Sequence, residues 1–139
     1  MSTRATIIIK RKDETVCQLY HHYDGYETGV GKTLHTVFNK YDEAKRIGYK
    51  ELIPLLFKLE TLQEGWELEP KERNHTDIEY LYFVDLETSK ITYFKGNKDE
   101  REERRRETIE LTGELLEKLE YDEFMRWKHY KETGERIYV

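Results

Sequence analysis

The residues best suited to chemistry lie in one segment rich in tyrosine, histidine and glycine, residues 19–33, which reads LYHHYDGYETGVGKT. Its glycines allow other groups to approach the backbone closely, and the helix expected to follow offers unpaired amides and the positive end of its dipole. Lys32 and Thr33 add a positive charge and a hydroxyl. Three tyrosines can stack on a base or fix the loop: Tyr20, Tyr23 and Tyr26. We therefore expect an anion-binding site in this loop.

Residues 31–33, Gly-Lys-Thr, are similar to the end of a phosphate-binding P-loop, but the spacing does not fit. That motif requires a glycine five residues before Gly31, where this chain has Tyr26. The strands are also expected to form hairpins rather than to alternate with helices, so the parallel core of that class is missing. We do not expect a nucleoside triphosphatase.

The neighbouring His21 and His22 raise the alternative of a metal site or a general base. Metal ligands must converge, whereas adjacent residues of a strand point to opposite faces, so at least one of the two is expected to be structural. Cys17, the single cysteine, is expected to be a small buried hydrophobic side chain, and no serine or cysteine has a recognisable nucleophile context. We expect no enzymatic activity, no metal and no cofactor.

A charged block, residues 98–106, is expected at the entry to a long C-terminal helix. Its arginines alternate with glutamates, which is typical of a solvated helix face with weak ion pairs. The alternative is that Arg104 and Arg105 bind a phosphate, because the guanidinium group matches its oxygens in a bidentate way.

The other elements must position this loop. Residues 4–12 and 15–20 are predicted to form a first hairpin, residues 66–70 a short edge strand, and residues 78–85 and 90–95 a second hairpin. Two central helices are indicated by apolar residues at helical spacing: Leu34, Val37, Phe38 and Tyr41 in the first, and Leu52, Leu55, Leu56, Leu59 and Leu62 in the second.

A long amphipathic helical stretch is predicted from Ile109 to Trp127, with a break near residues 121–122, and residues 133–139 are considered for a final strand. The predicted fold is α+β: a small antiparallel sheet built from hairpins, two central helices and a long C-terminal amphipathic helical region. A two-fold dimer would bury apolar surface left on that helix, so we expect a homodimer or a higher homo-oligomer.

Composition limits the classes of function. The 139 residues suit one domain, 1–139, and an aromatic content of 13% indicates that the chain folds although 38% of it is charged. A net charge of -5 does not favour binding to duplex nucleic acid. No apolar run approaches the roughly 20 residues that a bilayer requires, and no signal sequence is recognisable. We expect a cytoplasmic protein with no membrane partner.

Residues 20–31, from Tyr-His-His-Tyr-Asp-Gly-Tyr to Gly29 and Gly31, resemble a Tyr-x-x-(Tyr/Trp)-Asp-Gly-Tyr-x-x-Gly signature of small proteins encoded by phages and other mobile elements. The likeness covers about the first third of the chain. The functional class connected with it is the first class of Thoeris anti-defence sponges, which sequester cyclic ADP-ribose-type immune signals without degrading them.

This resemblance implies a phage-type anti-defence protein that binds a cyclic nucleotide in the host cytoplasm by stacking and phosphate pairing. The expected ligand-binding residues are Tyr23, Tyr26, Lys32, Arg104 and Arg105. Two alternatives stay open. One is an inhibitor that binds a protein effector of bacterial defence, such as an anti-CRISPR, and the other is a small metal-dependent nuclease or phosphodiesterase that uses His21 or His22.

Overall fold

The chain begins with the predicted hairpin. The computed structural model describes residues 3–40, 65–104 and 107–136. Strand β1 (Ala5–Arg11) pairs antiparallel with β2 (Glu14–His21). β1 is rich in β-branched residues and lies at the centre of the sheet, and its alternate side chains Ile7 and Ile9 are fully buried on one face.

Six strands form one sheet in the order β3-β2-β1-β4-β5-β6. Strand β3 (Trp66–Glu69) is the predicted edge strand, β4 (Tyr80–Asp85) and β5 (Lys90–Phe94) form the predicted second hairpin, and β6 (Ile109–Glu110) is very short. The α+β class is confirmed. The sheet is mixed rather than antiparallel, however, because β1 and β4 join the two hairpins in parallel.

One face of the sheet, called here the inner face, packs against α1 (Lys32–Lys40). Leu34, Val37 and Phe38 of this helix are at most 3% exposed and lie in the same apolar cluster as the inner-face residues of β1. The first of the two predicted helices is thereby confirmed, and the second, after Gly48, lies outside the described residues.

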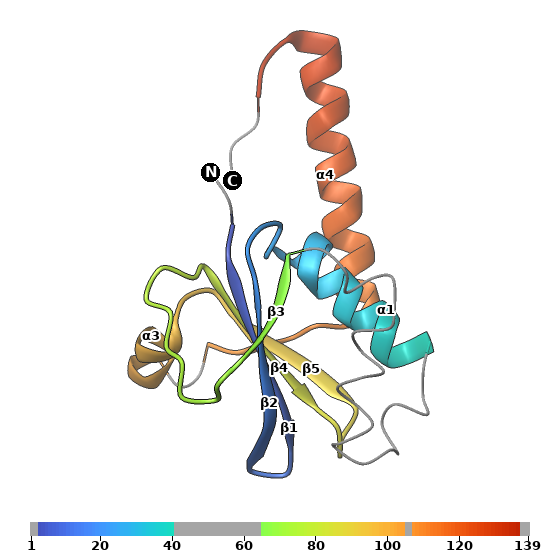
Figure 1. Cartoon of the computed structure of the whole chain (residues 1–139). Coiled ribbons are helices and arrows are strands. Elements are labelled where there is room, and N and C mark those ends of the chain that lie inside the picture. Colours follow the sequence, from blue (N-terminus) through green and yellow to red (C-terminus); the bar gives the residue numbers. More distant parts are fainter. Residues whose placement is uncertain (1–2, 41–64, 105–106, 137–139) are drawn as a thin grey trace.

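The outer face carries a second, smaller apolar cluster and the short helix α3 (Lys98–Glu103), on the opposite side of the sheet from α1 (Figure 1). Asn97 begins α3 with a capping box, in which its side chain accepts from the Glu100 amide at 2.9 Å and the Glu100 carboxylate accepts from the Asn97 amide at 3.1 Å. The Arg101 guanidinium lies 4.5 Å above the Phe83 ring. Residues 98–103 of the charged block thus form a helix of their own, and β6 lies between it and the long C-terminal helix, so the prediction that the block stands at the entry to that helix is wrong.

The C-terminal helix α4 (Gly113–Thr133) is continuous and projects away from the sheet (Figure 1). The Thr112 side chain caps its first turn, and Gly134, with φ 75°, ends it. The predicted break near residues 121–122 is wrong, because no proline or glycine interrupts residues 114–133. Ile109 belongs to β6 rather than to this helix. Within the described ranges, no helix has the length and apolar character needed to cross a bilayer.

Candidate functional site

The loop between β2 and α1 has a backbone that is fixed by hydrogen bonds to distant parts of the chain. The Gly25 amide donates to the Thr3 carbonyl at 2.9 Å. The buried Tyr82 hydroxyl donates to the Gly25 carbonyl at 2.6 Å. A preformed loop reduces the ordering cost of binding, so the side chains that this loop presents are suited to hold a ligand.

The tip of α1 is closed by the chain itself. A turn of π-helix, η1 (Glu27–Gly31), runs directly into α1. Four successive amides donate to backbone carbonyls of the loop, those of Gly29, Val30, Gly31 and Lys32. The prediction of unpaired amides at this helix tip is therefore wrong for these four residues.

The carboxylate of Glu27 lies in the first turn of η1, where the helix dipole favours a negative charge. This residue is 8% exposed. Its Oε2 accepts from the Tyr93 hydroxyl at 3.0 Å and lies 3.8 Å from Nζ of Lys95. The chain thus supplies its own anion at the place where the sequence predicts a bound one.

Three tyrosines pack beside Glu27 under the loop: Tyr80, Tyr82 and Tyr93. Their ring centroids are 5.7 to 6.3 Å apart. Burial raises the pKa of each hydroxyl, and the negative charge of Glu27 raises it further. These groups therefore remain protonated and serve as hydrogen-bond donors, which is a structural role.

The two predicted stacking residues of the loop, Tyr23 and Tyr26, are each 38% exposed. Tyr26 donates its hydroxyl to Asp24 at 3.0 Å, and burial together with this hydrogen bond raises its pKa. The Tyr23 ring lies 4.7 Å from the ring of His21. Tyr20 differs from both, because it is 6% exposed and stacks on His75 at 4.1 Å. Two of the three tyrosines thus keep part of the side chain exposed to solvent.

Lys32 belongs to a junction between the loop and α4. Its Nζ lies 2.7 Å from a carboxylate oxygen of Glu120, and the Thr28 hydroxyl donates to Glu123 at 2.6 Å. Trp127 follows Glu123 by four residues, which places it on the same side of the helix, and it is 55% exposed. This junction is not among the features predicted from the sequence, although the spacing of Glu120, Glu123 and Trp127 indicates a common helix face.

The two predicted arginines are not brought to the loop by the described residues. Arg104 ends α3 on the outer side of the sheet, and its Nη1 lies 3.6 Å from Glu107. The loop, by contrast, covers Tyr82 on the inner face, as the contact of Gly31 with that ring indicates. Arg105 lies outside the described residues.

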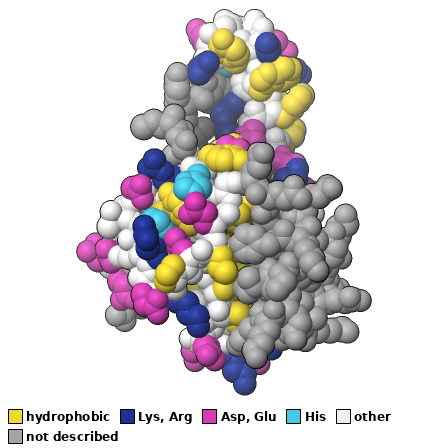
Figure 2. Space-filling model, in the orientation of Figure 1, with side chains coloured by type: hydrophobic (Ala, Val, Ile, Leu, Met, Phe, Trp, Pro, Cys, Tyr) yellow, Lys and Arg dark blue, Asp and Glu magenta, His cyan; other side chains and the backbone are white. Residues whose placement is uncertain are grey.

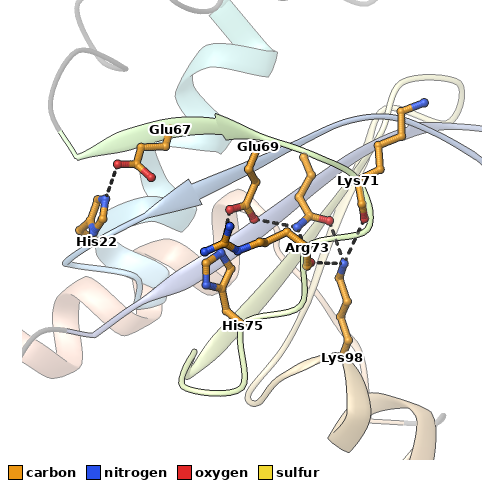
Figure 3. Close-up of polar contacts among 8 residues, drawn as sticks. His22, Glu67, Glu69, Lys71, Arg73, His75 and Lys98 are labelled. Carbon is orange, nitrogen blue, oxygen red and sulfur yellow. Dashed lines mark hydrogen bonds and ion pairs between the residues drawn. The ribbon is translucent and has the colours of Figure 1, made fainter.

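The two adjacent histidines point to opposite faces of the sheet, as their places in a strand predict. His21 is 5% exposed, its Nδ1 hydrogen bonds the Tyr23 carbonyl, and its ring packs on Trp66. His22 lies on the outer side, where its Nε2 is 2.9 Å from Glu67 (Figure 3). Among the described residues, no three His, Cys, Asp or Glu side chains are grouped to hold a metal ion.

A second polar cluster lies on the outer face, between β2, β3 and α3 (Figure 3). The fully buried Gln18 donates to Glu69 at 2.7 Å and to the Arg73 carbonyl at 2.8 Å, and it accepts from Lys98 at 2.8 Å. The second Glu69 oxygen lies 2.7 Å from Nε2 of His75. Desolvation lowers the pKa of Lys98. These bonds tie α3 to the sheet, so the cluster is a structural network rather than an open reactive site.

Cys17 also has a structural environment. It is 6% exposed, and burial raises the pKa of its thiol to about 12. The thiolate required of a nucleophile is therefore disfavoured at neutral pH, and the prediction of a buried hydrophobic side chain is confirmed.

Comparisons of this chain with protein-family models, with curated proteins and with solved structures find no match.

Proposed function

We propose that this protein acts by binding, as a phage-type anti-defence protein that sequesters a cyclic ADP-ribose-type signal without degrading it. The observation that supports this proposal is the pair of half-exposed tyrosines, Tyr23 and Tyr26, on a loop whose backbone is fixed by hydrogen bonds. A rigid aromatic face stacks on a purine at little entropic cost.

Binding is favoured over hydrolysis by the state of the candidate reactive groups. His21 is buried and bonded to a backbone carbonyl, and Cys17 is held as a thiol. His22, on the other side of the sheet from the loop, pairs with Glu67. None of these three side chains is placed beside Tyr26 so that it could act as a nucleophile or activate one. The loop is therefore better suited to retain a ligand than to cleave it.

The charge around the loop sets a condition on this proposal. Asp24, Glu120 and Glu123 lie beside Tyr26, Lys32 and Thr28 respectively, and Lys32 is already paired with Glu120. The amides of Gly29, Val30, Gly31 and Lys32 already donate to carbonyls of the chain, so they are not open to a phosphate. A phosphate requires Lys32 to leave Glu120, or positive side chains supplied from elsewhere.

The test is calorimetric titration of the full chain with cyclic ADP-ribose, with linear ADP-ribose as the comparison ligand. Replacing both Tyr23 and Tyr26 by Ala should weaken binding by about 1–3 kcal/mol per stacked base, roughly 5- to 150-fold. Tyr130→Ala is the matched control, because Tyr130 is 40% exposed but lies in the last turns of α4. Heating the complex should release the ligand unchanged, and recovery of a cleaved ligand would refute sequestration.

A protein-binding inhibitor remains the second candidate, and one observation favours it. The projecting part of α4 exposes several large hydrophobic side chains, which is typical of a protein interface. A defence effector retained by the protein in the absence of any nucleotide would support this candidate over the first.

A further inference from the structure

Helix α4 carries an exposed apolar surface that the rest of the described chain does not cover. Five large side chains are 40% to 62% exposed: Tyr121, Phe124, Met125, Trp127 and Tyr130. Figure 2 shows hydrophobic and basic side chains together on this projecting part of the molecule. Monomers rarely leave so many large aromatic groups in water on one element, so the surface is suited to an interface.

Residues on one side of α4 follow a mirror pattern around Phe124. At 3.6 residues per turn, one helix face carries Glu117, Glu120, Tyr121, Phe124, Trp127, Lys128 and Lys131. The intervals between them are three, one, three, three, one and three residues, which read the same in both directions. The acidic members precede Phe124 and the basic members follow it, so each glutamate has a lysine at the same distance on the other side.

We propose that α4 pairs antiparallel with α4 of a second copy of this chain, on a two-fold axis at Phe124. In this register Phe124 packs on the partner's Phe124, and Tyr121 packs on the partner's Trp127. Glu120 faces the partner's Lys128, and Glu117 faces the partner's Lys131. The spacing of three and four residues is that of an antiparallel helix seam, in which apolar groups fill the centre and charges flank it.

The charge pattern selects the antiparallel orientation. In a parallel pair Glu117 would face the partner's Glu117, and Lys131 would face the partner's Lys131, which places like charges together. Antiparallel pairing converts both ends into Glu–Lys contacts. The orientation therefore follows from the sequence of the seam rather than from its apolar content alone.

This pairing also completes the binding loop, a consequence that rests on the proposed function. Glu120 contacts Lys32 of the loop. The same register therefore brings the partner's Lys128 to the side of α4 that holds the loop. The second copy then supplies a further positive charge beside the Lys32–Glu120 pair.

The experiment measures the mass of the full chain without ligand, by sedimentation equilibrium over a range of concentrations. We expect a dimer of twice the 17.0 kDa chain mass. Phe124→Asp should leave a monomer, whereas Tyr130→Asp, at an exposed aromatic position outside the seam, should leave the dimer intact. Circular dichroism establishes that each variant is folded.

Charge reversal tests the register even if Phe124→Asp fails to fold. Lys131→Glu should weaken the dimer at least about tenfold, because it places two acidic pairs in contact. Adding Glu117→Lys in the same chain should restore the dimer, and Lys118→Glu, on another face, should have no effect. A native chain that stays monomeric, or a reversal that the second change does not rescue, would overturn the proposal. Because no ligand is present, failure of nucleotide binding leaves this test unaffected.

Discussion

Two regions of the molecule differ in how far the chain itself provides partners for their side chains: the loop between β2 and α1, and the projecting part of α4. The contacts Thr28–Glu123 and Lys32–Glu120 join them. In the loop the polar groups have partners within the chain, including a carboxylate at the helix tip. In α4, from Tyr121 onward, the large apolar groups are exposed. A loop rich in glycine and tyrosine is therefore not by itself a vacant site, and the exposed surface can lie on an ordinary helix instead.

The strongest test of this contrast is to remove the anchor of α4. Leu116 is 5% exposed in the inner-face core, so Leu116→Ala leaves a cavity and should lower the free energy of unfolding by about 2–5 kcal/mol. Leu68→Ala is the control, because Leu68 is 51% exposed and its loss should cost no more than about 0.5 kcal/mol. Urea denaturation measures both. Equal costs would mean that α4 is not anchored where its burial indicates.

Alkaline pH should lower the stability of the protein through the buried tyrosines under the loop. Tyr82 and Tyr93 have a raised pKa in the folded chain, whereas an unfolded tyrosine titrates near pH 10. Their contribution to stability is therefore complete below pH 10 and is lost as the pH rises above it. Each such hydroxyl adds about 1.4 kcal/mol per pH unit to the slope, so Tyr82 and Tyr93 together contribute about 3 kcal/mol per pH unit.

Thermal unfolding between pH 8 and 11 measures this loss. Tyr82→Phe removes one titrating group, so its stability should fall less steeply above pH 10 than that of the native chain. Tyr121→Phe is the control, because Tyr121 is 62% exposed and its removal should leave the slope unchanged. Equal slopes for all three proteins would contradict the burial of these hydroxyls.

The buried carboxylate gives a smaller effect. Glu27→Leu leaves the Tyr93 hydroxyl without its acceptor and should cost about 1–3 kcal/mol of stability. Combining it with Tyr93→Phe removes both partners, so the double variant should be more stable than the single one. If the double variant is instead less stable by the sum of the two separate losses, Glu27 does not act through Tyr93.

The local elements could be predicted because each has a signal in nearby residues. Alternating apolar residues indicate both hairpins, and Leu34, Val37 and Phe38 indicate α1. The parallel pairing of β1 and β4 has no such signal, because it joins segments about 75 residues apart, as in the pair Ile8–Phe83. The separation of α3 from α4 depends on β6, whose pairing with β5 has no signal in nearby residues.

The candidate site was predicted in part. The exposure of Tyr23 and Tyr26 agrees with a stacking role, but the closed helix tip could not be foreseen from the loop sequence alone. It depends on the backbone hydrogen bonds of η1, and the buried carboxylate beside it depends on Glu27 meeting Tyr93, 66 residues away. Likewise, glutamates of α4 meet Thr28 and Lys32 only in the folded chain, so local spacing does not indicate that the loop is surrounded by acidic groups.

The smallest expected change in stability, that of Lys32→Ala, bears most directly on whether the loop can bind an anion. Lys32 is the positive side chain of the loop that a phosphate would need, yet it is paired with Glu120. The Lys32 side chain is 55% exposed and that of Glu120 is 41% exposed. Because water screens such a pair, Lys32→Ala should cost no more than about 1 kcal/mol of stability. Urea denaturation measures this cost, and Lys118→Ala is the control. Because so weak a pair opens readily, Lys32 is available to an anion although it is bonded in the free protein. A loss well above 1 kcal/mol would mean that the pair locks the loop to α4 and that Lys32 is not free to serve a ligand.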